Sequence, residues 1–170
     1  MSIEIIGLCG PKGVGKSTYA KTLEPEALVC SFALPIKKML STILPSEGWL
    51  NQKDESPPGF PENCTVRYMH QHLGTAFGRE TCYPNIWVDA AYRMIEPHIG
   101  KRTIVFDDVR FPNEAWAIRR WGVSNEVFTK IIHISRVGFE PDENDHHVSE
   151  AGLPRMMIDK WVTVDDQGVE

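Results

Sequence analysis

The sequence of 170 residues has few cysteines and no long apolar run. Its four cysteines, Cys9, Cys30, Cys64 and Cys82, are scattered and form no C-x-x-C pair, which argues against a zinc site. Two of them fall inside apolar, strand-like segments, and this usage is typical of a reducing, cytoplasmic setting. No apolar run is long enough to span a bilayer, and no charged-then-apolar leader opens the chain. We therefore expect a cytoplasmic protein with no membrane partner.

The sequence also has no excess of basic residues over acidic ones. Lysine and arginine together number 18 against 23 acidic residues, which gives a net charge of −5. This balance argues against a broad nucleic-acid surface, although a local cationic cluster would still suit a nucleotide. Apolar residues make up 42% of the chain, an ordinary share for a globular protein, and the length is typical of a single domain over residues 1–170.

What the sequence does contain is a glycine-rich segment at residues 10–18, GPKGVGKST, which fits the phosphate-binding pattern G-x-x-x-x-G-K-[ST]. Glycines in such a loop let successive backbone N–H groups point at phosphate oxygens. The lysine reaches the β- and γ-phosphates, and the serine hydroxyl binds Mg²⁺. An apolar, β-branched run precedes the segment and a helical pattern follows it, as the motif requires. The predicted ATP-binding residues are Gly10, Lys12, Gly13, Val14, Gly15, Lys16, Ser17 and Thr18.

Strand and helix patterns alternate along the rest of the chain. Strands are predicted over residues 3–9, 27–32, 102–106, 130–135 and 161–164. Helices are predicted over residues 17–23, 35–44, 65–73, 85–98 and 112–121, with Gly74 and Gly122 ending two of them. The stretch 45–63, rich in proline and glycine, is predicted to be a loop. This alternation indicates a mostly parallel sheet covered by helices on both faces.

In such sheets ligands bind at the carboxyl ends of the strands. Asp107 and Asp108 follow the predicted strand at 102–106, where phosphate-loop enzymes place a carboxylate that supports Mg²⁺. Spacing alone leaves open which of the two faces the metal, and a strand-end cap is the alternative for the pair. Arg110 follows the same strand, and Arg136 follows the next one. Arginine is suited to offset the charge of a transferring phosphoryl group.

The middle of the chain offers residues for a second ligand. Arg67 and Gln71 lie four residues apart on a predicted helix and so share one face. On that face the arginine would bind a phosphate and the amide a base edge. Trp87 would either stack on a base or pack in the core, and its helical spacing is typical of a core residue.

Several segments together resemble the phage deoxynucleoside monophosphate kinases. They are LCGPKGVGKST at 8–18, FALPIK at 32–37, TVRYMHQHLGT at 65–75, PNIWV at 84–88, DVRFPNEA at 108–115 and HHVSEAGLP at 146–154. The resemblance implies a three-layer α/β/α P-loop NTPase fold with a mostly parallel sheet. It also implies a helical acceptor-binding insertion at 33–98 and a lid at 137–150. The implied activity is transfer of the γ-phosphate of ATP, with Mg²⁺, to deoxynucleoside 5′-monophosphates in dNTP biosynthesis.

The same resemblance implies roles for individual residues. The implied catalytic residues are Lys16, Asp108, Arg110 and Arg136, and the implied metal ligands are Ser17 and Asp107 or Asp108. The implied acceptor-binding residues are Arg67, Gln71, Thr75, Arg79, Trp87 and Arg110, and those of the lid are His147, Ser149 and Glu150. The lid segment before His147 carries acids and no arginine, so we expect Arg136 to supply that charge. The partners are then small nucleotides, without nucleic acid, and a homodimer is one expected assembly.

Two other functions fit parts of the sequence. A P-loop kinase with another acceptor, such as dephospho-coenzyme A or a small alcohol, would share the phosphate loop. The pair of Arg67 and Gln71 favours a phosphorylated, base-bearing acceptor only weakly. A nucleotide-dependent switch or binding module would leave the middle of the chain unexplained, and the sequence has no guanine-reading N-K-x-D pattern.

Overall fold

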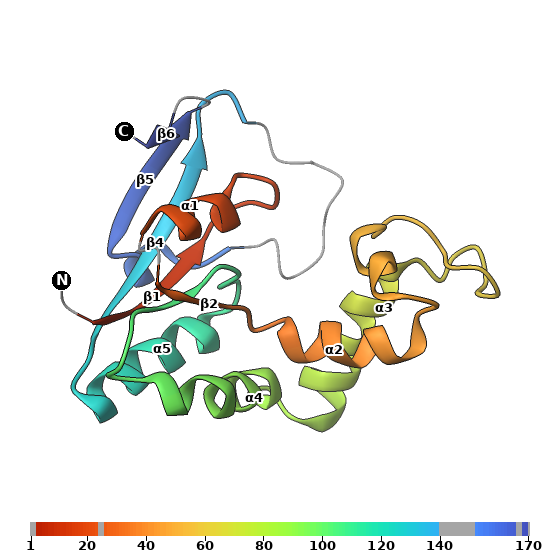
Figure 1. Ribbon diagram of the computed structural model, residues 1–170, viewed down its shortest axis with the longest axis horizontal. Coiled ribbons are helices and arrows are strands. Elements are labelled where there is room, and N and C mark those ends of the chain that lie inside the picture. Colours follow the sequence, from red (N-terminus) through yellow and green to blue (C-terminus); the bar gives the residue numbers. More distant parts are fainter. Residues whose placement is uncertain (1–2, 24–25, 140–151, 166–167, 170) are drawn as a thin grey trace. The chain divides into compact units, whose positions relative to one another are not determined.

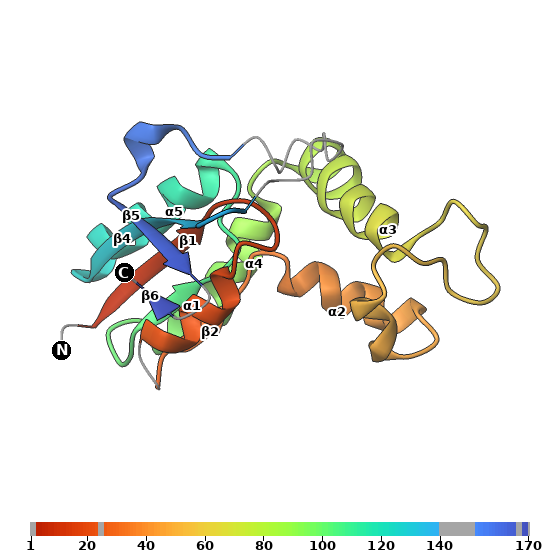
Figure 2. The same ribbon diagram turned by 90° about the horizontal axis from the view of Figure 1, so that it is seen from above.

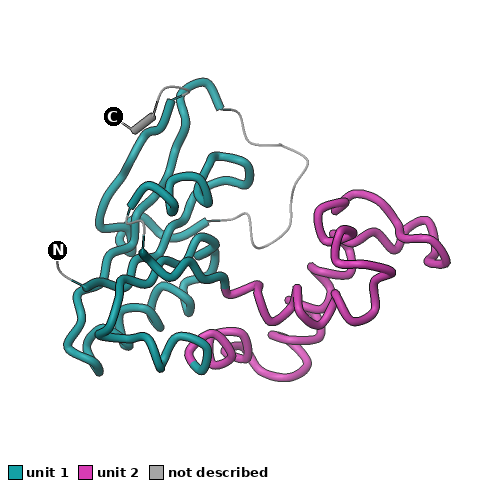
Figure 3. Tube along the Cα trace, viewed as in Figure 1, with its two compact units in different colours: residues 1–31, 93–170 teal, residues 32–92 magenta. Residues whose placement is uncertain are grey.

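The computed structural model describes residues 3–23, 26–139, 152–165 and 168–169. The chain divides into two compact units, one of residues 1–31 and 93–170 and the other of residues 32–92 (Figure 3). The second unit covers most of the range 33–98 in which the sequence predicts the acceptor-binding insertion. Each unit is described by itself below.

The first unit is built on a six-stranded sheet with the strand order β2-β3-β1-β4-β5-β6 (Figure 1). Its strands are β1 (Glu4–Cys9), β2 (Leu28–Cys30), β3 (Ile104–Phe106), β4 (Phe128–Arg136), β5 (Lys160–Asp165) and β6 (Gly168–Val169). Neighbours among the first five strands pair in parallel, and β6 pairs antiparallel with β5. The predicted, mostly parallel sheet is confirmed, while β6 is a strand that the sequence pattern did not indicate.

Helices cover both faces of this sheet. Ile6 and Leu8 of β1 pack in one cluster with side chains from α1 (Lys16–Leu23). Gly7 lies between them and faces the other way, since a Cβ there would meet side chains that include one from α5 (Pro112–Asn125) at 2.8 Å. Successive residues of a strand point to opposite faces, so α1 and α5 lie on opposite sides of β1 (Figure 2). The predicted three-layer arrangement is confirmed.

The helix α5 extends beyond its predicted end at Gly122. It runs to Asn125 and is followed by Glu126 in a left-handed conformation, with φ of 56°. Gly122 is required inside the helix by close packing on the sheet. A Cβ at this position would lie 2.2 Å from Cγ2 of Thr129 and 2.7 Å from the carbonyl oxygen of Val127. The glycine therefore marks a close approach and does not end the helix.

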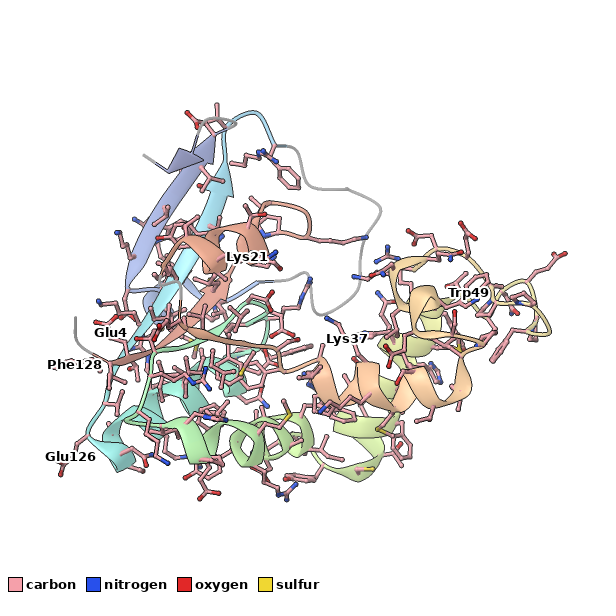
Figure 4. All side chains as sticks on the ribbon, in the orientation of Figure 1. Glu4, Lys21, Lys37, Trp49, Glu126 and Phe128 are labelled. Carbon is pink, nitrogen blue, oxygen red and sulfur yellow. The ribbon has the colours of Figure 1, made fainter. Side chains whose placement is uncertain are left out.

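The second unit is helical. Its elements are α2 (Leu34–Ile43), the 3₁₀ helix η1 (Glu47–Asn51), α3 (Val66–His72), the π-helix η2 (Leu73–Cys82) and α4 (Ile86–Ile95), which continues past the unit's last residue. Among its described residues, the first unit also contains the 3₁₀ helices η3 (Glu96–His98) and η5 (Arg155–Met157). The element η1 falls in the predicted loop at 45–63, and Trp49 of η1 (labelled in Figure 4) packs against the buried core of this unit. That core consists of Ile36, Leu40, Leu44, Val66, Met69 and Trp87.

The helical segment from α3 to η2 is continuous. Thr65 caps α3 as predicted, because its Oγ1 accepts a hydrogen bond from the backbone N–H of Tyr68 at 3.1 Å. The prediction that Gly74 ends this helix is wrong, since the chain continues as a π-helix. The Gly74 carbonyl oxygen accepts hydrogen bonds from Nε1 of Trp87 at 2.7 Å and from Nη1 of Arg79 at 2.9 Å. These two side-chain donors stabilise a helical form that is rare and is often found at functional sites.

None of the helices among the described residues has both the length and the apolar character needed to cross a membrane.

Candidate active site

The glycine-rich loop starts where β1 ends and turns sharply at Gly10. This residue has φ of 128°, and a Cβ there would lie 2.3 Å from the carbonyl oxygen of Ile134 in β4. Only glycine suits both the backbone conformation and the close approach. Val14, in the middle of the loop, is fully buried in the core cluster under α1. The loop is thus anchored to the sheet at two points, while Lys12, Ser17 and Thr18 are exposed.

Lys16 lies folded over this loop. Its side chain is buried, and Nζ donates hydrogen bonds to the carbonyl oxygens of Gly10 at 2.8 Å and Pro11 at 2.7 Å. Burial, together with the nearby positive charge of Arg110, lowers the pKa of Lys16 to about 8, against the opposing effect of the carboxylates Asp108 and Asp107. The charges of Lys16, Arg110 and the two carboxylates therefore influence one another at this edge of the sheet.

The two adjacent aspartates that follow β3 have different partners. Oδ2 of Asp107 accepts a hydrogen bond of 2.6 Å from Oγ of Ser17, the first residue after the loop lysine. Oδ2 of Asp108 accepts a hydrogen bond of 2.6 Å from Oγ of Ser31, which follows β2. The structure thus pairs Asp107, and not Asp108, with the serine that the phosphate-loop motif assigns to the metal.

A buried carboxylate fixes the turn that carries Arg110. Glu114 is 2% exposed, and its Oε2 accepts hydrogen bonds from the backbone N–H groups of Arg110 at 2.8 Å and Phe111 at 3.1 Å. These bonds satisfy backbone donors at the start of α5, where a helix has no intrahelical partner for its first N–H groups. The sequence analysis missed Glu114, although an acidic residue at the third helical position after a proline is a recognisable helix-start signal.

Arg136 ends β4 and is exposed. Its carbonyl oxygen accepts a hydrogen bond from the backbone N–H of Phe139 at 3.2 Å. Residues 140–151, which contain the predicted lid residues His147, Ser149 and Glu150, lie outside the part of the chain that the structure describes.

The residues predicted to bind the acceptor all belong to the second unit, apart from Arg110. Arg67 and Gln71 lie on α3 and are half-buried, as is Thr75 in η2. Arg67 makes a two-point ion pair with Asp54, from Nε to Oδ1 at 2.5 Å and from Nη2 to Oδ2 at 3.0 Å. The sequence analysis missed Asp54, because nothing in the local pattern of the loop indicates a partner on a later helix.

Trp87 is a core residue in this structure. It is 4% exposed, and its ring packs so closely on η2 that a Cβ on Gly78 would lie 2.5 Å from it. Its only polar atom, Nε1, donates the hydrogen bond to Gly74 described above. A ring covered in this way has no face available for a base, so of the two roles that the sequence left open the structure favours core packing.

Comparison with known proteins adds one match. The family model of deoxynucleotide monophosphate kinase matches residues 51–170. A search of curated proteins finds no match for this sequence. The matched range begins after the phosphate loop, so the loop and the family model are separate observations that indicate the same chemistry.

Proposed function

We propose how individual residues of this chain, which belongs to the deoxynucleotide monophosphate kinase family, take part in its reaction. The chain is thus a phosphotransferase that uses ATP to phosphorylate deoxynucleoside monophosphates. The observation that carries the proposed roles is the hydrogen bond of 2.6 Å between Ser17 and Asp107, beside the buried ammonium group of Lys16. It brings together the three groups that phosphate-loop kinases use to hold ATP and its metal ion.

The chemistry of this pair suits Mg²⁺. This ion is usually held by one or two protein oxygens together with phosphate oxygens and water. Among the described residues, no group of three or more histidine, cysteine or acidic side chains could hold a metal ion, so a site rich in protein ligands finds no support there. Oγ of Ser17 and a carboxylate oxygen of Asp107 would hold the ion, which when bound offsets negative charge on the β- and γ-phosphates.

The reaction requires positioning more than proton transfer. An oxygen of the acceptor's phosphate attacks the γ-phosphorus, while the bond from that phosphorus to the β–γ bridging oxygen breaks and ADP leaves with the electron pair. The attacking oxygen is already anionic near neutral pH, so the reaction needs no strong general base. Lys16 and Arg110 would stabilise the charge that develops on the transferring group, and Arg136 would add to it from the end of β4. The phosphates of ATP would also raise the pKa of Lys16 and keep it charged.

We assign the acceptor to the second unit, which lies largely within the range of the family match. Arg67 would bind the 5′-phosphate through guanidinium N–H donors other than the two that bind Asp54. Gln71, four residues further along the same helix, would contact the base, with Thr75 and Arg79 nearby on the continuing π-helix. Asp108 would order the start of the second unit indirectly, because its partner Ser31 is the last residue before that unit.

The biological setting is part of the proposal. All four cysteines are free thiols, which supports a reducing compartment such as the cytoplasm, here that of a host if the source is a bacteriophage. The net charge of −5 supports small nucleotides as partners, without nucleic acid. A homodimer is supported by the exposure of Trp116 (61%) and Val123 (82%) on α5, and sedimentation equilibrium tests it.

A product assay tests the proposed reaction. The protein is incubated with ATP and with dAMP, dCMP, dGMP or dTMP, and the diphosphate is separated and quantified with Mg²⁺ present or removed by EDTA. We expect diphosphate from at least one monophosphate and none in EDTA. Parallel reactions with dephospho-coenzyme A and small alcohols test the rival acceptors. Phosphorylation of one of these alone, or slow ATP hydrolysis that no monophosphate changes, would contradict the proposal.

A further inference from the structure

A short segment of the second unit lies against the start of α3. We call residues Lys53, Asp54 and Glu55 the 53–55 strap. The carbonyl oxygens of Lys53 and Glu55 accept hydrogen bonds from the backbone N–H groups of Arg67 at 2.6 Å and Val66 at 3.1 Å. Asp54, between them, makes the two-point ion pair with the Arg67 side chain. The strap therefore holds both the backbone and the guanidinium group of one residue.

The ion pair has little to contribute to stability. The side chain of Asp54 is 75% exposed and that of Arg67 is 25% exposed, and ion pairs in such contact with solvent stabilise proteins only weakly. What the two-point geometry does achieve is orientation. A carboxylate that accepts from both Nε and Nη2 fixes the plane of the guanidinium group as well as its position.

The strap reduces the conformational entropy that is lost when the guanidinium group is oriented. The backbone on each side of Asp54 is tied to α3 by one of the two hydrogen bonds, so the aspartate backbone is already ordered. Forming the ion pair then immobilises only the side-chain rotamers of Asp54 and Arg67. Preorganised groups of this kind improve binding mainly by removing the cost of ordering them when the ligand arrives.

We propose that Asp54 is a positioning residue, which holds the Arg67 guanidinium group in the orientation that receives the acceptor's 5′-phosphate. The inference rests on the role proposed above for Arg67. Asp54 also brings a negative charge near an anionic ligand, and because its side chain is 75% exposed, the high dielectric constant of water weakens the repulsion. We expect the orienting effect to exceed the repulsion, and the direction in which KM changes in Asp54→Asn measures the balance between the two.

The test is a comparison of steady-state constants among variants of the full chain. Asp54→Asn keeps an oxygen acceptor and removes the charge-assisted pair, and we expect it to raise KM for the accepted monophosphate about tenfold. KM for ATP and kcat at saturating monophosphate should stay within about twofold, because Arg67 acts on the acceptor alone. Asp54→Glu retains the carboxylate, so its KM for the monophosphate should lie below that of Asp54→Asn.

Glu55→Gln is the matched control. It removes the same charge from the neighbouring residue of the strap and leaves the carbonyl oxygen that binds Val66. We expect no rise in KM for this variant, which separates positioning from a general charge effect. A double-mutant cycle completes the test, since Asp54→Ala should have no further effect on KM in an Arg67→Ala background. Circular dichroism melting of every variant identifies any loss of folding.

Two results would overturn the inference in distinguishable ways. If Arg67→Ala raises KM for the monophosphate while Asp54→Asn leaves it unchanged or lowers it, Asp54 does not position Arg67, and a lowered KM shows that it competes with the phosphate. If Arg67→Ala itself leaves KM unchanged, the acceptor role proposed for Arg67 is wrong and the inference is lost with it.

Discussion

Replacing Lys16 with methionine should make the stability of the nucleotide-free protein less dependent on pH, and it removes the residue that we propose holds ATP. Lys16 is 8% exposed, and burial together with Arg110 lowers its pKa to about 8. An unperturbed lysine titrates near pH 10.4. The difference between these two pKa values corresponds to about 3 kcal/mol of folding free energy, which the charged ammonium group costs the native state below pH 8.

Methionine removes this cost but also removes the two hydrogen bonds from Nζ to the loop carbonyls. Hydrogen bonds from a charged donor contribute about 1.5–3 kcal/mol each. At pH 7 their loss should therefore offset the cost that methionine removes, and the variant should be about as stable as the wild type or less stable by up to about 3 kcal/mol.

The direction in which stability changes with pH follows from the pKa of Lys16 in the folded and unfolded states. The native state releases the Lys16 proton near pH 8, whereas the unfolded chain keeps it until about pH 10.4. The unfolded state therefore binds more protons in this window, and the stability that depends on Lys16 rises with pH. Because the methionine variant lacks this contribution, its stability relative to the wild type should fall by about 3 kcal/mol as the pH rises through the window. Burial raises the pKa values of Cys9 and Cys30 to about 11, so both affect stability at high pH. Cys30 cancels in the difference between the two proteins, whereas Cys9 does not cancel fully, because the charge of Lys16 lowers its pKa in the wild type.

Urea unfolding of both proteins without nucleotide, at intervals from pH 7 to pH 10, measures this difference. Calorimetric titration at pH 7 should show that the variant no longer binds ATP. A stability difference that stays constant over this pH range would refute the reasoning, because Lys16 would then titrate alike in the folded and unfolded chains.

Four further substitutions test separate parts of the account. Asp107→Asn should lower kcat by about 10²–10³, which is the effect of losing one preorganised charge at the reacting group. Asp108→Asn should lower kcat by about tenfold or less. Equal losses of kcat in steady-state assays would show that the two aspartates are not distinguished by their partners. Gly10→Ala should lower the free energy of unfolding by about 1–3 kcal/mol, since the new Cβ would lie 2.3 Å from a carbonyl oxygen of β4, and urea denaturation checks it. Trp87→Phe removes one buried hydrogen bond and should destabilise the protein by about 1–3 kcal/mol, again measured in urea, while leaving KM for the monophosphate within about twofold; a large rise in KM would mean that the indole contacts the substrate.

The parts of the fold that the sequence predicted are those that depend on local patterns. The phosphate loop has fixed spacing, and the buried strands of a parallel sheet are continuous apolar runs, so both were recognisable without a structure. The two glycines that seemed to end helices have other causes. Gly122 is small because α5 packs on β4, and Gly74 lies where a Cβ would be 3.1 Å from Cδ1 of Ile36 in α2. Neither cause is visible in a window of neighbouring residues.

The same reason explains which site contacts the sequence did not predict. The hydrogen bond that distinguishes Asp107 from Asp108 joins the former to Ser17, 90 residues earlier in the chain. Adjacent residues of identical type have the same local pattern, so only the fold can assign them different partners. The pair of Asp54 and Arg67 likewise joins a loop to a helix 13 residues later, beyond the reach of helical periodicity. The residue types at the site were predictable, and their pairing was not.

Separate binding measurements on the two substrates give the most direct test of the division of roles. Isothermal titration of Mg²⁺–ATP, and then of the accepted monophosphate, would be carried out on the wild type, Lys16→Met and Arg67→Ala. We expect Lys16→Met to lose ATP binding and keep its affinity for the monophosphate, and Arg67→Ala to show the reverse. If both variants lose both ligands alike, or if neither loses either, the two units do not divide the substrates between them and the account is wrong.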